Sequence, residues 1–231
     1  MWSSNPAWGA PRIQAELQKL GIDVSDSTIR RYRPSRPRQP SQNWRSLLEN
    51  HLGDIAALDF FVVPTPRFRA LYVLLIMAHD RCRILHFNVT TPPSARWTAR
   101  QVLEAFPHDT RPRFLLHDQD KIFAGDVARQ VRSMGTEEVL TAPRSPWQNA
   151  YCERLIGSIR RDCLDHVVVL NERHLLRVLR SYASYDHASR THRALDGDSP
   201  DSRAVEPPEH GEVIAYPQVG GIHHRYARRA A

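Results

Sequence analysis

The sequence predicts an α/β domain in which three antiparallel strands and then parallel strands form one mixed sheet flanked by helices. Three apolar runs rich in Val, Ile, Leu and Phe, at residues 55–63, 70–78 and 83–89, follow one another with short connections. Such connections favour an antiparallel meander. Two shorter apolar runs, at 114–116 and 139–140, alternate with helical patterns, and this alternation is typical of a mixed sheet with helices packed on it.

The helices that pack on this sheet are predicted from the helical spacing of apolar residues. They cover residues 97–106, 123–134, 146 to about 163, and 172 to about 184. Gly135 ends the second helix, as glycine commonly does, and Pro146 suits the first turn of the third. The domain formed by these elements is predicted to span residues 51–199.

The segments outside this domain are predicted to be small. Helices over residues 11–20 and 27–32 resemble the last part of a helix-turn-helix within residues 1–33, with the preceding helix missing; a docking hairpin is the alternative. Residues 34–50 are predicted to form an extended basic linker, because Pro34, Pro37 and Pro40 block helix and sheet. Residues 200–231 are a Pro-rich tail without periodicity.

The charge of the chain favours a nucleic acid as its partner. The formal net charge is +7 over 231 residues, and Lys and Arg that neutralise phosphates release counterions. Arg36 and Arg38 of the linker are predicted to lie along a DNA backbone. A solvated linker without contacts is the alternative.

Several other classes of protein are disfavoured. The longest apolar run, residues 70–78, is much shorter than the about 20 residues that span a bilayer, and no signal peptide is present, so we expect a cytoplasmic protein. Cys82, Cys152 and Cys163 include no C-x-x-C pair, which favours free thiols. No Gly-rich phosphate loop or nucleophile elbow supports an NTPase or a serine hydrolase.

Three carboxylates are the candidates for chemistry. Asp59 interrupts an apolar strand, where a charge is costly unless it is paired or binds a metal. Asp118 ends a second apolar strand, and Glu153 lies 35 positions later in a helix. Adjacent strands with a helix packed beside them would bring the three together. Clustered carboxylates repel each other unless a cation neutralises them, and their oxygens suit Mg²⁺ or Mn²⁺. The alternative is that each carboxylate is a strand-end cap or an ion-pair partner.

Three segments resemble the signature blocks of the integrase core family, which comprises retroviral integrases and transposases of many bacterial insertion sequences. The segments are residues 59–61 (DFF), 117–123 (HDQDKIF) and 145–154 (SPWQNAYCER), and residues 8–13, 170–175 and 185–192 are also similar to the bacterial members. The resemblance implies a ribonuclease-H-like fold. It also implies phosphoryl transfer with two metal ions, and action as a multimer on transposon-end and target DNA.

The resemblance assigns the catalytic and metal-binding roles to Asp59, Asp118 and Glu153. The family often has a glycine after the second aspartate, whereas this chain has Gln119 followed by Asp120 and Lys121. Asp120 therefore competes with Asp118 as a ligand. We favour Asp118 because it directly ends the strand.

Further site residues are predicted on the helix that carries Glu153. Asn149 and Glu153 are four residues apart and share a helix face, which Gly157 and Arg160 continue. Asn149 is predicted to orient DNA or a metal-bound water, and Arg160 to hold a phosphate. The alternative is that Asn149 is a polar residue of the first turn and that Arg160 belongs to a solvated face.

The sequence therefore predicts a transposase or integrase that catalyses metal-dependent cleavage and strand transfer of DNA. One alternative is a catalytically inactive DNA-binding remnant, which the incomplete helix-turn-helix favours. Another is a ribonuclease-H-like nuclease without strand transfer, because the same metal ions activate either nucleophile.

Overall fold

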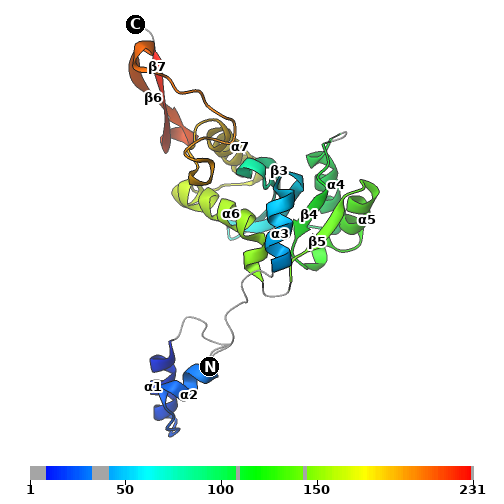
Figure 1. Cartoon of the computed structure of the whole chain (residues 1–231), viewed down its shortest axis with the longest axis vertical. Helices are drawn as coiled ribbons and strands as arrows, with labels where there is room; N and C mark the ends of the chain where they lie inside the picture. The colour runs from blue at the N-terminus through cyan, green and yellow to red at the C-terminus, as the bar shows by residue number, and fades with distance from the viewer. Residues whose placement is uncertain (1–8, 33–41, 108–109, 143–144, 230–231) are drawn as a thin grey trace. The chain divides into compact units, whose positions relative to one another are not determined.

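The computed structural model of the chain describes residues 9–32, 42–107, 110–142 and 145–229. It divides into two compact units, Met1–Ser41 and Gln42–Ala231 (Figure 1). Arg36 and Arg38 of the predicted linker lie outside the described residues. No helix in the described ranges is long and apolar enough to cross a membrane.

The smaller unit contains the two predicted helices, α1 (Ala10–Lys19) and α2 (Asp26–Arg31). Ile13 and Ile29 are buried between them, and the Ser25 hydroxyl caps α2 by accepting from the backbone N–H of Thr28 (3.2 Å). Both helices are confirmed. Their interpretation as part of a helix-turn-helix stays a prediction.

The larger unit is built on one five-stranded sheet with the strand order β3-β2-β1-β4-β5. Its strands are β1 (Ile55–Pro64), β2 (Ala70–Ala78), β3 (Ile84–Thr90), β4 (Phe114–His117) and β5 (Glu137–Leu140). The first three pair antiparallel, and β4 pairs parallel with both β1 and β5. The mixed sheet predicted from the sequence is confirmed, and its central strands are buried because helices cover both faces.

Two layers of helices cover this sheet (Figure 1). One face packs against α4 (Ala95–Ala105) and α5 (Asp126–Ser133) through a core that includes Leu58, Leu115 and Val102. The opposite face packs against α6 (Ala150–Asp162) and α7 (Glu172–Ala188). Side chains alternate along a strand, so successive residues of β1 pack alternately into the two cores.

The prediction of an extended linker is wrong for residues 42–50. These residues belong to α3 (Gln42–His51), whose Trp44 is only 8% exposed and joins the core shared with α6 and α7. Leu47 and Leu48 pack against the same core. All three prolines precede residue 42, so they do not prevent the helix from forming, and apolar residues at helical spacing dock it.

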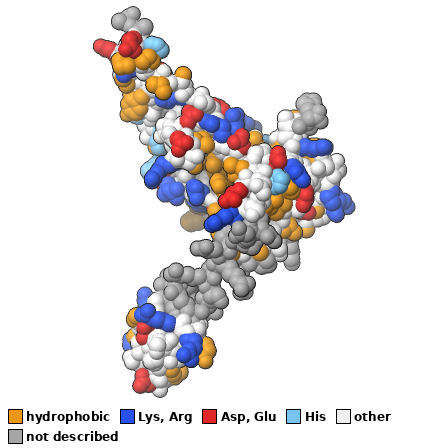
Figure 2. Space-filling view, viewed as in Figure 1, with side chains coloured by type: hydrophobic (Ala, Val, Ile, Leu, Met, Phe, Trp, Pro, Cys, Tyr) orange, Lys and Arg blue, Asp and Glu red, His pale blue; other side chains and the backbone are white. Residues whose placement is uncertain are grey.

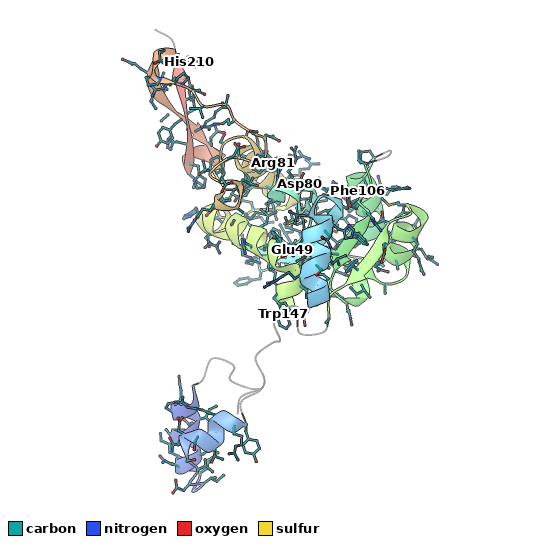
Figure 3. The ribbon with its side chains drawn as sticks, viewed as in Figure 1. Glu49, Asp80, Arg81, Phe106, Trp147 and His210 are labelled. Atoms are coloured by element: carbon teal, nitrogen blue, oxygen red, sulfur yellow. The ribbon has the colours of Figure 1, made fainter. Side chains whose placement is uncertain are left out.

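The tail also contains structure that its sequence pattern did not predict. Strands β6 (Glu212–Gln218) and β7 (His223–Arg229) form an antiparallel hairpin. The imidazole of His223 stacks on Tyr185 of α7 with ring centroids 4.6 Å apart. The loop before the hairpin is held by Arg81 (Figure 3), whose guanidinium donates to Asp198 Oδ2 (2.8 Å) and to the Ser199 carbonyl (2.7 Å).

Candidate active site

The register of the two central strands brings Asp59 and Asp118 level. Ala57 of β1 is opposite Leu116 of β4 in the parallel pair, and two further residues along each strand lead to Asp59 and to Asp118. Because side chains alternate, Asp59 lies on the same face as Ala57, and that face packs against α6. The strands thus direct both carboxylates towards one end of the sheet.

The helix α6 places Glu153 at the same end. Glu153 is in its first turn, next to Cys152, which packs against the sheet. Both the Asp118 and the Glu153 carboxylates raise the pKa of Asp59 by electrostatic repulsion. The structure therefore brings the three predicted carboxylates into one neighbourhood, and their assignment as catalytic residues stays a prediction.

The three carboxylates differ in their environment. Asp59 is half-buried, whereas Asp118 and Glu153 are exposed. Burial is the main cause that raises the pKa of Asp59 to about 6, and a hydrogen bond that its Oδ1 accepts from the Phe60 N–H (2.7 Å) opposes this rise. Desolvation also raises the pKa of Glu153. A cation bound between them would favour the ionised form of all three carboxylates.

The donor chemistry of this group suits a hard cation. Among the described side chains, no Lys, Arg or His forms an ion pair with any of the three carboxylates, and carboxylate oxygens are the ligands that Mg²⁺ prefers. Yet no three His, Cys, Asp or Glu side chains in the described ranges lie close enough together to hold a metal ion as they stand.

Asp120 forms contacts of a different kind. Its Oδ1 accepts from the N–H of Ile122 (3.2 Å), and its own N–H donates to Asp118 Oδ1 (3.1 Å). Asp120 thus caps the turn η3 (Lys121–Phe123), and the charge that acts on Asp59 comes from Asp118. The choice of Asp118 over Asp120 as the second ligand stays a prediction.

Asn149 is placed differently from the sequence-based prediction. It lies in the 3₁₀ turn η4 (Pro146–Asn149) that precedes α6 and that also contains Trp147, labelled in Figure 3, so it is not part of the regular helix that carries Glu153. The side chain is 5% exposed, and its Nδ2 donates to the Leu58 carbonyl of β1 (3.4 Å). This amide fastens the start of α6 to the strand of Asp59, and the predicted role of Asn149 in orienting DNA or a metal-bound water stays a prediction.

Arg160 lies about two turns beyond Glu153 on α6. It is half-buried, its Nη2 donates to the Val62 carbonyl (3.1 Å), and its guanidinium covers the Phe61 ring at 5.5 Å from the centroid. The remaining N–H groups of a guanidinium stay available for a phosphate. Its role in DNA binding stays a prediction.

His117 is a structural partner of the site that sequence reasoning did not single out. The ring is 1% exposed, its Nδ1 donates to the Asp118 carbonyl (2.6 Å), and its Nε2 lies 2.9 Å from Glu138 Oε1. This pair of contacts ties the backbone of Asp118 to β5. Residue spacing carried no signal for it, because Glu138 lies 21 positions away.

Comparisons with known proteins find a similarity to integrases and transposases. Residues 134–200 match the model of the integrase core domain family, and no curated protein matches the chain. A chain of the simian T-cell lymphotropic virus intasome in complex with PP2A regulatory subunit B56 gamma is 14% identical with a TM-score of 0.56, and the alignment covers 92% of this chain and 82% of that chain.

The catalytic domain of Mos1 mariner transposase is similar in structure as well. It is 12% identical with a TM-score of 0.51, over 65% of this chain and 85% of that chain. A second structure of this domain, with raltegravir and Mg, has a TM-score of 0.52 at 11% identity, over 64% of this chain and 85% of that one. The resemblance to the integrase core family and the ribonuclease-H-like fold are therefore confirmed.

Proposed function

We propose that this chain, a relative of the integrase core family, catalyses metal-dependent phosphodiester cleavage and strand transfer in DNA. The observation that carries the proposal is the convergence of Asp59, Asp118 and Glu153 from two adjacent parallel strands and a helix. A structure of the similar Mos1 domain was determined with Mg. We therefore propose Mg²⁺ or Mn²⁺, as two ions, for this chain.

The three carboxylates would hold these ions, which when bound activate a water or a 3′-hydroxyl and stabilise the leaving oxygen of the phosphodiester. The Phe60 N–H fixes one oxygen of Asp59, so the other remains free for a ligand. Because the pKa of Asp59 is raised to about 6, this carboxylate is ionised above that pH. Arg160 is proposed to hold a phosphate beside β1.

DNA is the proposed partner on three grounds. The net charge of +7 favours a polyanion, a similar chain belongs to an intasome, and basic side chains lie on both the α6 side and the α4–α5 side of the larger unit (Figure 2). We propose that the substrates are transposon ends and target DNA, that the chain acts as a homo-oligomer, and that Arg36 and Arg38 contact the backbone. A cytoplasmic location is proposed with this substrate.

The test is a cleavage and joining assay with the full chain. Supercoiled plasmid and duplexes with free 3′-hydroxyl ends are incubated with Mg²⁺ or Mn²⁺. We expect nicking and end joining by the unmodified chain, and neither by Asp59→Asn, Asp118→Asn or Glu153→Gln. Asp126→Asn, which changes a carboxylate of α5 paired with Arg129, is the matched control and should retain activity. Equal nicking by a site variant and by the control would remove that residue from the site.

Two other candidates are an inactive DNA-binding protein and a ribonuclease-H-like nuclease without strand transfer. The same assay separates the possibilities. Nicking without joining supports the nuclease. DNA binding without nicking, in either metal, supports the inactive protein.

A further inference from the structure

The turn between β1 and β2 presents a fully exposed aromatic side chain between two arginines. Phe68 is 100% exposed and has a φ of +56°, which is a strained conformation for a bulky residue. The turn is nevertheless well fixed. The Phe68 N–H donates to the Thr65 carbonyl (2.9 Å), and the Thr65 hydroxyl donates to the Arg69 carbonyl (3.1 Å). Strain of this kind is concentrated at functional positions.

A groove of about 700 Å³ lies beside this turn. Its wall is formed by the turn, by Thr91 at the end of β3, and by residues 170–173 at the start of α7. Three arginines line it, Arg67, Arg69 and Arg173, against the single acidic residue Glu172. Leu170 adds apolar surface. The groove is therefore lined by both cationic and apolar groups.

The arginines of this groove are not neutralised. None of the three forms an ion pair with a carboxylate in the described part of the chain. A second groove, between α4 and α5, has a volume of about 630 Å³, but there Arg100 pairs with Glu104 at 2.8 Å and Arg129 pairs with Asp126. The second groove therefore has a surplus of one positive charge, from Arg96, whereas the first groove has a surplus of two.

The position of the groove suits a ligand that also reaches the candidate active site. Pro64, at the end of β1, is five residues from Asp59, which corresponds to about 17 Å along an extended strand. Arg160 donates to the carbonyl of Val62, which lies on β1 between Asp59 and the groove. A DNA duplex rises about 3.4 Å per base pair, so one short duplex spans the distance.

We propose that this groove binds the backbone of duplex DNA through Arg67, Arg69 and Arg173, with Phe68 packed against a sugar or base. The inference rests on the proposed function only in its choice of DNA as the ligand. Unneutralised guanidinium groups suit phosphates, and apolar side chains that enter a groove of DNA pack against the bases. The groove is therefore a DNA-binding site distinct from the carboxylates.

The test measures binding of the full chain to a fluorescent 30-base-pair duplex over a series of salt concentrations, in EDTA. Arg67→Ala/Arg69→Ala should weaken binding and lower the slope of log affinity against log salt by about two. Phe68→Gly should weaken binding about fivefold or more and leave the slope unchanged. Glycine favours the positive φ at this position, so this variant should melt no lower than the unmodified chain, and unfolding is excluded as the cause of its effect.

The matched control is Arg96→Ala/Arg100→Ala, which removes two arginines from the groove between α4 and α5 and should change affinity and slope less. Equal effects of the two double variants, or unchanged DNA binding with altered self-association in Phe68→Gly, would overturn the proposal, and the latter would indicate a protein partner. The binding measurement is made in EDTA, without metal ions, so a negative result says nothing about metal-dependent cleavage. Conversely, a chain that never cleaves DNA can still confirm the groove.

Discussion

Replacing Asp59 by asparagine should stabilise the folded chain at neutral pH while abolishing the proposed chemistry. The half-buried carboxylate is ionised at neutral pH next to two other negative charges, and without a cation this arrangement opposes folding. Asparagine has nearly the same shape, carries no charge, and can still accept the hydrogen bond from the Phe60 N–H. Function and stability therefore conflict at this position.

The magnitude follows from the pKa of Asp59, which rises from 3.8 to about 6 on folding. One pKa unit corresponds to about 1.4 kcal/mol, so the ionised form of Asp59 costs about 3 kcal/mol more in the folded than in the unfolded chain. The folded chain binds the proton more tightly, so this cost is absent below pH 3.8, grows between pH 3.8 and about 6, and is complete above that range.

The assay is urea denaturation of the unmodified chain and of Asp59→Asn in EDTA, at pH 8 and at pH 5. The variant should be more stable by about 3 kcal/mol at pH 8, and about half of this advantage should be lost at pH 5. Asp165→Asn, at an exposed position, controls for the general effect of removing a negative charge. An advantage of equal size at both pH values, or a less stable variant at pH 8, would show that the ionised Asp59 carboxylate does not oppose folding.

Three further predictions concern the core. Arg190→Gln should destabilise the chain by about 1–3 kcal/mol in urea denaturation, because the fully buried Asp186 loses one of its two ion-pair partners, Arg190 (3.4 Å), and keeps only His192 (3.5 Å); a loss below 1 kcal/mol would contradict this. Trp44→Ala should cost about 3–5 kcal/mol by detaching α3, and an unchanged denaturation midpoint would show that α3 contributes nothing. Burial raises the pKa of the Cys152 thiol well above its usual value, so Cys152 should resist a thiol reagent in the folded chain while half-buried Cys82 reacts first, and the reverse order would contradict the burial.

The elements of the sheet and the carboxylate neighbourhood were predictable because their signals are local. An aspartate within a run such as Ala57-Leu58-Asp59-Phe60-Phe61 is visible without a structure, and adjacent parallel strands bring their ends together. The register that makes Asp118 level with Asp59 follows from the pairing of strands far apart in the sequence. No residue pattern defines that register.

Other features depend on contacts that no local pattern encodes. The helix α3 is stabilised by the docking of Trp44 on a distant core, although the prolines nearby suggested an extended chain. In the hairpin of β6 and β7 the side chains are exposed or half-buried on both faces, so the alternation that normally indicates a strand is absent. The buried Asn149 side chain likewise depends on a distant contact, because it donates to the carbonyl of Leu58, 91 positions away.

The most direct test of a metal site formed by the carboxylates is calorimetric titration of Mn²⁺ into the unmodified chain and into Asp59→Asn/Asp118→Asn at pH 7.5. At this pH Asp59 is ionised, because its pKa is about 6. We expect saturable binding to the unmodified chain and none to the double variant, which should remain folded. Equal binding to both chains, or no binding to the unmodified chain, would contradict it.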